Sequence, residues 1–285
     1  MKLLRREVEK PWGRAGLAGG EDRKIGEIWF EAPDRRPLPL LVKRIFTSGK
    51  LSVQVHPDDA QARARGLPNG KSECWYILDA EPGALLGLGF REEIGKDRLR
   101  AAARDGSIEA LIDWRPVRRG DFFYVPAGTV HAIGAGLSLI EVQQPSEITY
   151  RLYDYGRPRA LHLDDGVDVA DTGPYPAACR THVEGNSDRV LVDGPHFTLI
   201  HVAGGKAEAL ADRQRWAMPL AGTVRCGDDV AAAGDCLLVE PGRPLDAEGS
   251  FLLAAAGPYR PSSAAAAKAI GPSGPASGPR PGAVT

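Results

Sequence analysis

The chain has 285 residues, of which 43% are hydrophobic, enough apolar material to bury a globular core. Its 36 lysines and arginines nearly balance its 37 aspartates and glutamates. No net field therefore favours nucleic acid or an anionic membrane, and any charge that recognises a phosphate must be local. No apolar run approaches the roughly 18 residues that span a bilayer, and the first seven residues lack the apolar centre of a signal peptide. We therefore expect a cytoplasmic protein.

The first informative strand pattern covers residues 51–56, where apolar and polar side chains alternate. Because side chains alternate between the two faces of a strand, Gln54 and His56 project from the same face. Residues 58–65 predict a short helix, and Glu73 opens another strand-like segment over residues 73–78.

A helical pattern interrupts the strands between Leu78 and Trp114. We expect this insertion, about residues 91–114, to pack on the outside of the β-structure through one apolar face. The residues of that face are Leu99, Ala102, Ala103, Ile108, Leu111 and Ile112.

Residues 120–131 carry the strongest motif. Gly120, Pro126, Gly128 and His131 occupy every fixed position of the pattern G-x5-P-x-G-x2-H, the second motif of the cupin β-barrels. That resemblance implies that His131 is a metal ligand inside a small barrel. With the upstream pattern, the candidate ligands become two imidazoles, one carboxylate and one amide: Gln54, His56, Glu73 and His131. This donor set suits zinc, with positions left open for water or substrate oxygens.

Other residues that can bind metals lie outside these patterns. Four histidines fit no ligand spacing and are interpreted as core or surface residues: His162, His182, His196 and His201. The four cysteines form no C-x2-C pair, so we expect free thiols at Cys74, Cys179, Cys226 and Cys236.

Over about residues 8–170 the chain resembles the class I mannose-6-phosphate isomerases, also called phosphomannose isomerases. The similarity rests on five segments: residues 10–13 (KPWG), 54–59 (QVHPDD), 70–76 (GKSECWY), 126–133 (PAGTVHAI) and 141–154 (EVQQPSEITYRLYD). The family's glutamine, histidine, glutamate and histidine zinc ligands fall on Gln54, His56, Glu73 and His131. Glutamine as the first ligand is distinctive, because most other metal cupins have histidine there.

The same resemblance implies catalytic roles for Arg151 and Lys71. Longer members of the family carry a histidine before this lysine, where the chain has Gly70, and an aromatic residue at the position of Ile133. Both departures resemble the short bacterial branch. For substrate contacts we expect Trp12, at the mouth of the pocket, with Asp58 and Arg157; Lys43 is a further candidate for the phosphate. The base that moves the carbon-bound proton stays open between metal-bound water, Lys71 and a carboxylate such as Asp58.

The rest of the chain predicts a weak internal repeat. Residues 120–128 align without gaps on residues 234–242, which places Leu245 opposite His131. Matching Trp75 to Trp216 places Gln214 opposite Glu73. The second copy therefore lacks the ligand histidine and predicts a metal-free lobe.

We thus expect an all-β dominated fold with two cupin (jelly-roll β-barrel) lobes and a small helical insertion in the first. The predicted domains are a metal-binding cupin over residues 1–160, a connecting segment over 161–189 and a degenerate, metal-free cupin-like domain over 190–260. Residues 261–285, rich in Ala, Ser, Gly and Pro, predict a disordered tail.

The function that the resemblance implies is a zinc-dependent aldose-ketose isomerase, with one Zn²⁺ per chain, that interconverts mannose 6-phosphate and fructose 6-phosphate through a cis-enediolate. Two alternatives stay open. One is a non-catalytic sugar-phosphate-binding cupin, against which the presence of Lys71 and Arg151 argues. The other is a metal-dependent cupin dioxygenase, against which the glutamine ligand argues. The expected partner is a small phosphosugar, with neither nucleic acid nor membrane, and the sequence gives no oligomeric state.

Overall fold

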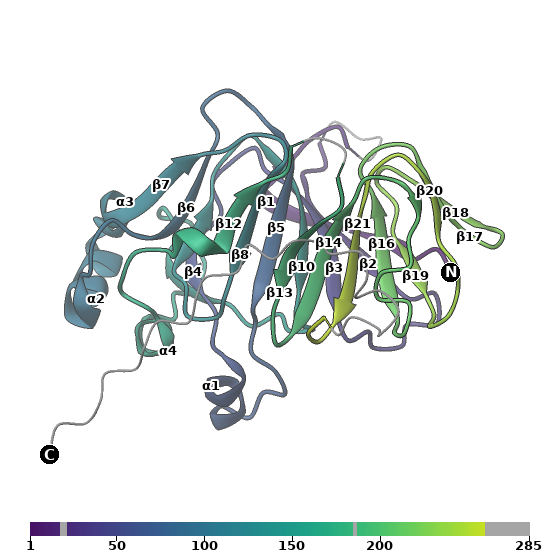
Figure 1. The fold of residues 1–285 in the computed structure, drawn as a ribbon. Coiled ribbons are helices and arrows are strands. Elements are labelled where there is room, and N and C mark those ends of the chain that lie inside the picture. Colours follow the sequence, from purple (N-terminus) through teal and green to yellow (C-terminus); the bar gives the residue numbers. More distant parts are fainter. Residues whose placement is uncertain (18–21, 185–186, 260–285) are drawn as a thin grey trace, which may run out of the picture.

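A computed structural model describes residues 1–17, 22–184 and 187–259. Most of these residues form antiparallel strands, which build four sheets in two lobes (Figure 1). The all-β fold with two lobes, predicted from the sequence, is confirmed.

The first lobe is a barrel of two facing sheets. Its seven-stranded sheet has the order β1 (Leu4–Arg14), β2 (Ile25–Glu31), β3 (Leu41–Phe46), β10 (Leu137–Gln143), β5 (Glu73–Ala80), β8 (Asp121–Val125) and β12 (Arg180–His182). Its five-stranded sheet has the order β11 (Tyr150–Tyr153), β4 (Val53–Val55), β9 (His131–Ile133), β6 (Leu85–Phe90) and β7 (Ile112–Pro116). Apolar side chains from both sheets, such as Trp75 and Leu86, fill one end of the space between them.

The second lobe repeats this arrangement. Its larger sheet has the order β13 (Arg189–Asp193), β14 (Phe197–Val202), β21 (Phe251–Ala256), β16 (Arg215–Pro219) and β19 (Leu237–Val239). Its smaller sheet has the order β15 (Gly205–Lys206), β20 (Asp246–Glu248), β17 (Thr223–Cys226) and β18 (Asp229–Ala232). The larger sheet reproduces the order β2-β3-β10-β5-β8 of the first lobe, with strands in the same sequence along the chain.

The strand register corrects the predicted match between Trp75 and Trp216. Trp75 lies opposite Phe123 on β8, whereas Trp216 lies opposite Leu238, one residue beyond the position that aligns with Phe123. A slip of one residue exchanges the two faces of a strand. Trp75 accordingly points into the first barrel, and Trp216 packs between the lobes.

With this register, Arg215 takes the place of Glu73 in the second lobe, because Glu73 pairs with Val125 and Arg215 pairs with Val239. Arg215 is fully buried, and its guanidinium donates to the backbone carbonyls of Ala207, Ala209 and Arg243. The second barrel therefore carries a buried cation where the first has a carboxylate. This difference explains why the repeat cannot hold a metal in the same way.

The helices lie outside the first barrel (Figure 1). They are α1 (Asp59–Ala64), α2 (Gly95–Asp105), α3 (Ile108–Leu111), α4 (Leu163–Val169) and a 3-10 turn (Ala177–Cys179). The predicted insertion is confirmed as α2 and α3, and Leu99, Ala102, Ala103 and Ile108 of its predicted face are buried. The short helix expected near residue 58 is α1, which begins with a capping box between Asp58 and Gln61.

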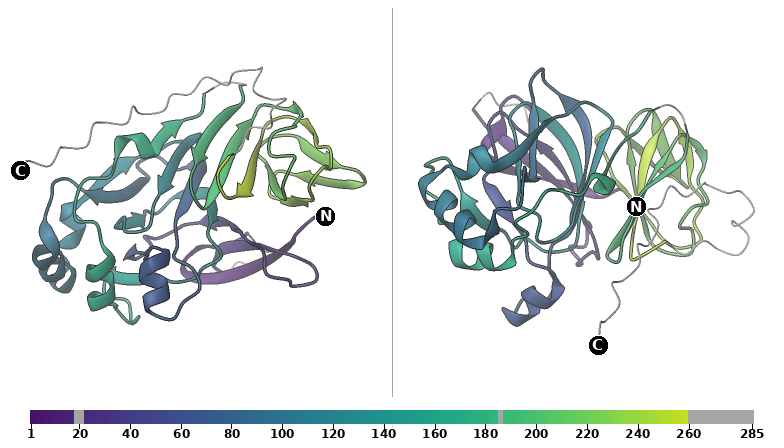
Figure 2. Two further views of the ribbon diagram at one scale, coloured as in Figure 1. Left: turned by 60° about the horizontal axis from the view of Figure 1, so that its bottom comes forward. Right: turned by 60° about the vertical axis from the view of Figure 1, so that its left-hand side comes forward.

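The two lobes pack through their larger sheets (Figure 2). Both faces of the seven-stranded sheet are therefore covered, and neighbouring residues on a strand serve different compartments. On β3, Val42 packs against the second lobe, whereas Lys43 and Ile45 face the interior of the first barrel. The amino end of the chain also joins the lobes, since the Leu3 amide donates to the Cys236 carbonyl at 2.9 Å.

The predicted connecting segment contains structure that belongs to the first lobe. Helix α4 packs on β11, and β12 adds a seventh strand beside β8. The domain boundaries stay a prediction, and the predicted tail lies outside the described residues. All four cysteines are free thiols. No helix in the described part of the chain is long and apolar enough to cross a membrane.

Candidate metal centre

Three strands of the first barrel bring the candidate ligands together. Gln54 on β4 lies directly opposite His131 on β9, so both side chains point to the same face of the smaller sheet. His56 follows the end of β4 on that face, and Glu73 is the first residue of β5 in the facing sheet. The alternation noted in residues 51–56 therefore places its polar side chains inside the barrel.

His56, Glu73 and His131 form a compact cluster, with one ligand atom from each within 4.8 Å of the others. His56 Nε2 lies 3.6 Å from Glu73 Oε2, and His131 Nε2 lies 3.4 Å from Glu73 Oε1. All three residues are at most 2% exposed. Among the described residues this is the only group of three or more His, Cys, Asp or Glu side chains arranged to hold a metal ion.

The donor atoms of the cluster lie against one another, the Gln54 amide and the Lys71 ammonium. His131 Nδ1 lies 2.9 Å from the Thr129 carbonyl, which can only accept, so the lone pair of the neutral ring is on Nε2. Both carboxylate oxygens of Glu73 are buried, and Oε2 forms an ion pair with Lys71 at 2.9 Å. Gln54 Nε2 lies 3.2 Å from His131 Nε2, so this amide reaches the cluster. A half-turn of the amide would direct its oxygen to the same point. These donors fit a divalent metal with nitrogen and oxygen ligands.

The electrostatics of the cluster also suit a cation. Burial, together with the Lys71 ammonium, lowers the pKa of His56 to about 3. Burial also lowers the pKa of His131, so both imidazoles are neutral near pH 7, as metal ligation requires. Burial opposes ionisation of Glu73, but Lys71 and the two histidines outweigh it and hold the pKa of Glu73 well below its usual range.

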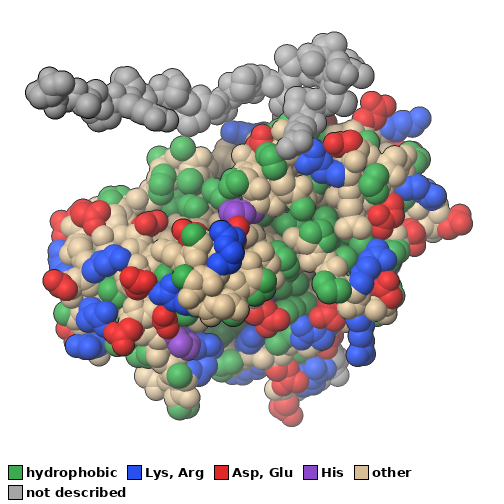
Figure 3. All heavy atoms as spheres, turned by 90° about the horizontal axis from the view of Figure 1, so that it is seen from below, with side chains coloured by type: hydrophobic (Ala, Val, Ile, Leu, Met, Phe, Trp, Pro, Cys, Tyr) green, Lys and Arg blue, Asp and Glu red, His purple; other side chains and the backbone are tan. Residues whose placement is uncertain are grey.

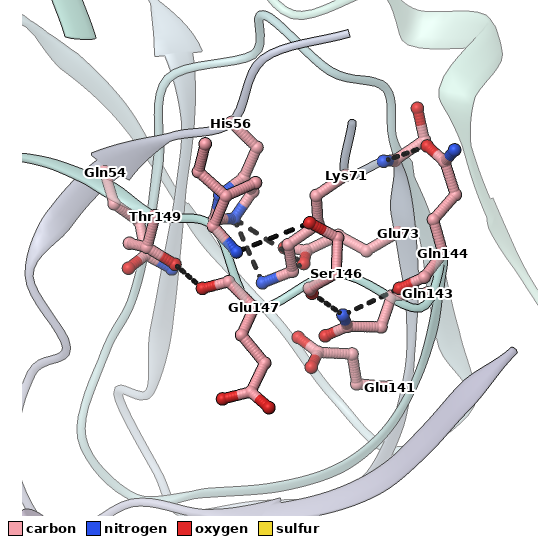
Figure 4. A network of polar contacts seen from close by, with 12 residues as sticks. Gln54, His56, Lys71, Glu73, Glu141, Gln143, Gln144, Ser146, Glu147 and Thr149 are labelled. Carbon is pink, nitrogen blue, oxygen red and sulfur yellow. Dashed lines mark hydrogen bonds and ion pairs between the residues drawn. The ribbon is translucent and has the colours of Figure 1, made fainter. Parts of the chain in front are cut away.

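Lys71 touches the cluster directly (Figure 4). Its Nζ lies 2.9 Å from Glu73 Oε2 and 3.2 Å from His56 Nε2, and the residue is 5% exposed. Burial favours its neutral amine, yet the charges of Glu73 and Glu141 outweigh burial and raise the pKa of Lys71. The cluster thus holds one ammonium among its donor atoms.

The backbone before Lys71 explains why the chain has glycine at position 70. A Cβ there would lie 2.5 Å from the Pro57 carbonyl oxygen and 2.4 Å from the Asp58 carbonyl carbon. No side chain fits this close approach. Glycine at position 70 therefore follows from the close approach of the backbone to residues 57 and 58.

Arg151 stands beside the ligands in the same row of the smaller sheet. It lies opposite Gln54 on β4, which in turn lies opposite His131, so the three side chains share one face. Its guanidinium donates to the Ala160 carbonyl at 3.1 Å. Burial and the nearby charge of Arg159 lower the pKa of Arg151. This register brings Arg151 to the edge of the metal cluster, and its catalytic role stays a prediction.

The three predicted substrate contacts lie elsewhere. Trp12 is 4% exposed and packs in the apolar core of the first barrel. Asp58 is exposed and caps helix α1, where it accepts from the Gln61 amide at 2.7 Å. Arg157 forms an ion pair with Asp154 at 3.3 Å and donates to the Lys50 carbonyl. The structure joins none of the three to the ligand cluster, and their substrate roles stay predictions.

A buried polar network lies next to the candidate ligands (Figure 4). The sequence singled out only Lys43 from this network and did not predict its partners. Lys43 Nζ lies 2.9 Å from Glu141 Oε2 and donates to Gln143 Oε1 at 2.6 Å. Gln143 lies directly opposite Glu73, so the network continues the row of the ligands. The available signal was a charged residue inside an apolar strand, because Lys43 and Glu141 each interrupt such a run. The other four histidines lie outside the cluster.

Comparison with known proteins finds mannose-6-phosphate isomerases among the relatives of the chain. No model of a protein family matches the chain. Among curated proteins, the mannose-6-phosphate isomerase of Streptococcus mutans is 43% identical over 169 residues, covering 56% of this chain and 53% of that protein. Bacillus subtilis ManA, named mannose-6-phosphate isomerase, is 41% identical over 191 residues, or 61% and 60% of the two chains. The match to these two relatives thus spans between half and two thirds of their length.

Solved structures agree over more of the chain. The Bacillus subtilis mannose 6-phosphate isomerase superposes with a TM-score of 0.73 and 26% identity over 89% of this chain and 98% of that one. A mannose 6-phosphate isomerase bound with zinc and yttrium has the same fold, with a TM-score of 0.68 and 16% identity over 90% and 99%.

A third curated relative, the mannose-6-phosphate isomerase homologue YvyI of Bacillus subtilis, matches over a longer stretch than the two relatives above. It is 34% identical over 229 residues, 71% of this chain and 70% of that protein. The chain therefore belongs to the mannose-6-phosphate isomerase family.

Proposed function

We propose that the protein is a zinc-dependent isomerase that interconverts mannose 6-phosphate and fructose 6-phosphate through a cis-enediolate. One observation carries the proposal: the buried His56–Glu73–His131 cluster, with the Lys71 ammonium in contact with two of its members. Family membership supports the substrate, because the relatives are named for mannose 6-phosphate.

The donor set favours zinc among the common metals. Two neutral imidazoles and a carboxylate, with the Gln54 amide beside them, match zinc sites that keep positions open. A bound zinc would polarise the sugar carbonyl and stabilise negative charge on the neighbouring oxygens without redox chemistry.

The chain supplies the remaining positive charge. Lys71 Nζ carries its proton at the centre of the cluster and can offer charge, or the proton, to oxygens on the reacting carbons. Arg151 extends the row of Gln54 and His131, where a planar guanidinium can orient an anionic substrate. His56, Glu73, His131 and Lys71 are at most 5% exposed, and Gln54 is partly exposed. The burial of the first four keeps water away from a charged intermediate.

The structure changes the set of candidates for the base that moves the carbon-bound proton. Asp58 is exposed and occupied as a helix cap. Glu141 lies in the buried network and affects the charge of Lys71. We therefore favour Glu141 over Asp58 as the carboxylate that could act as the base. Lys71 and metal-bound water remain the other two candidates.

Surface charge fits a small substrate. Basic and acidic side chains are intermingled over the face shown in Figure 3, in keeping with the near balance of charge in the sequence. The charge for phosphate recognition is therefore expected from individual side chains inside the barrel, with Lys43 as a buried candidate.

The test is direct. The purified chain, with its metal content measured, is incubated with mannose 6-phosphate, and formation of fructose 6-phosphate is read through a coupled reaction while dissolved oxygen is followed. We expect product at constant oxygen. Oxygen consumption would favour the dioxygenase alternative, and substrate binding without product from a zinc-loaded sample would favour a sugar-phosphate-binding protein.

A further inference from the structure

A cavity of about 500 Å³ lies between the two lobes, away from the metal centre. One wall is the outer face of the seven-stranded sheet, and the other is β16 with the turn at Gly234. Neighbouring residues on β3 show the separation, since Lys43 points to the metal-binding interior and Arg44 lines the cavity. An occupant of this cavity would therefore not touch the metal ligands.

The lining combines cations with apolar side chains. Three arginines and two aspartates line it, together with Phe30, Leu78, Ile140 and Met218. Asp235 is already neutralised by Lys2, at 2.8 Å, and by Arg5. Arg14 is engaged with Glu81 at 3.3 Å. Arg44, Arg119 and Asp79 remain, so the cavity is net positive.

Neither of these two arginines forms an ion pair with an acidic side chain in the described parts of the chain, and the buried Arg44 Nε has no hydrogen-bond partner there. The Arg44 guanidinium lies 5.0 Å from the centre of the Phe46 ring, and burial with the nearby Arg5 charge lowers its pKa. A partly buried cation without an ion pair costs stability. Because Arg44 lines the cavity, its guanidinium is available to bind an anion there.

The turn at Gly234 is shaped around this guanidinium. A Cβ at Gly234 would lie 2.7 Å from Arg44 Nη1 and 3.2 Å from Arg5 Nη2, and the residue has a φ of +98°. The positive φ favours glycine at this position, and the absence of a Cβ leaves room for the guanidinium. At the opposite rim, Asp79 and Arg119 are exposed, so the cavity opens to solvent on their side.

We propose that this cavity is a second ligand site, which binds a small organic phosphate through Arg44 and Arg119 and packs the ligand's apolar part against the side chains of Phe30, Ile140 and Met218. Guanidinium groups bind phosphate in a bidentate manner. The apolar wall favours a phosphate ester over a free inorganic anion, and 500 Å³ accommodates a molecule of metabolite size.

The test uses phenyl phosphate as the probe, with inorganic phosphate and benzoate for comparison, in calorimetric titrations of the zinc-loaded protein. We expect phenyl phosphate to bind one site per chain and more tightly than either comparison ligand. Arg44→Gln and Arg119→Gln should each weaken this binding by about tenfold or more, since each removes a charge-assisted contact. Arg118→Gln is the matched control, because this exposed neighbour pairs with Glu184 instead, and it should bind as the wild type does.

Three outcomes would overturn the proposal. The first is no phenyl phosphate binding by the wild-type protein at millimolar concentration. The second is binding that Arg44→Gln and Arg119→Gln leave unchanged, which would place the probe elsewhere, including the metal centre. The third is a lower melting temperature of ligand-free Arg44→Gln with unchanged affinity, which would assign Arg44 to packing. The proposal expects that variant to melt no lower than the wild type, because it loses only a desolvated charge.

Discussion

Replacing Lys71 by methionine separates the two roles that this ammonium combines. Lys71 Nζ lies 2.9 Å from Glu73 Oε2 and is the only ammonium or guanidinium that pairs with this buried carboxylate among the described residues. Lys71→Met thus leaves a buried carboxylate without a charged partner, a change that typically costs about 3–5 kcal/mol. For a chain of this size, such a loss lowers the melting temperature by roughly 6–20 °C.

Zinc should reverse this loss, since the bound ion supplies positive charge to the same carboxylate. The zinc-loaded variant should therefore melt within a few degrees of the zinc-loaded wild type. Its zinc affinity should be at least as high, because the ammonium no longer competes for Glu73 and His56. Turnover should nevertheless fall on the order of a hundredfold or more, as expected for a lost preorganised charge.

The assay is thermal unfolding of both proteins with EDTA and with zinc, followed by kinetics on mannose 6-phosphate. Lys43→Met is the matched control: Lys43 is also 5% exposed and forms a buried 2.9 Å ion pair with Glu141, but it touches no ligand. The melting temperature of Lys43→Met should fall by a similar amount with and without zinc. If the melting temperature of Lys71→Met fell equally with EDTA and with zinc, zinc would not take over the role of the ammonium beside Glu73.

The remaining predictions concern the ligands, Arg151 and pH. Alanine at His56, Glu73 or His131 should each lower bound zinc in elemental analysis, and Gln54→Ala should have a milder effect, because a neutral amide is the weakest of the four ligands; full zinc occupancy in His131→Ala would remove this site. Arg151→Ala should keep zinc and fold but lose turnover, with kcat and kcat/KM falling together; a change confined to KM would place Arg151 on the phosphate, and recovery in Arg151→Lys would show that the planar fork is dispensable. The metal-free protein should lose stability as pH falls below the ordinary histidine pKa of 6.5, because the unfolded chain takes up protons that His56, with a pKa of about 3, and His131 do not. Between pH 6 and 5, urea unfolding should show a fall that approaches about 1.4 kcal/mol per pH unit from His56, with a further fall in the same direction from His131 and a smaller change between pH 7 and 6; a flat profile would contradict neutral, buried imidazoles.

The clustering of His56, Glu73 and His131 could be predicted because its signals are local, whereas their role as metal ligands stays a prediction. Alternation over residues 51–56 fixed the shared face of Gln54 and His56, and the turn residues around Pro126 and Gly128 marked the approach to His131. The structure brings His56, Glu73 and His131 together as these patterns predicted.

The sequence was insufficient where long-range register decides. Trp75 and Trp216 look equivalent along the chain, but a shift of one residue points them into different compartments. Pairing of Lys43 with Glu141 required β3 and β10 to be neighbours, which no local pattern reveals. Asp58, three residues before Gln61, carries a capping signal, and its expected role in substrate binding stays a prediction.

Zinc dependence is tested most directly by stepwise return of zinc to the metal-free protein, with bound metal and isomerisation of mannose 6-phosphate measured on the same samples. Activity should rise in proportion to bound zinc and saturate at one ion per chain, with no such rise in His131→Ala. Background turnover at full zinc occupancy, or full turnover without metal, would contradict zinc dependence.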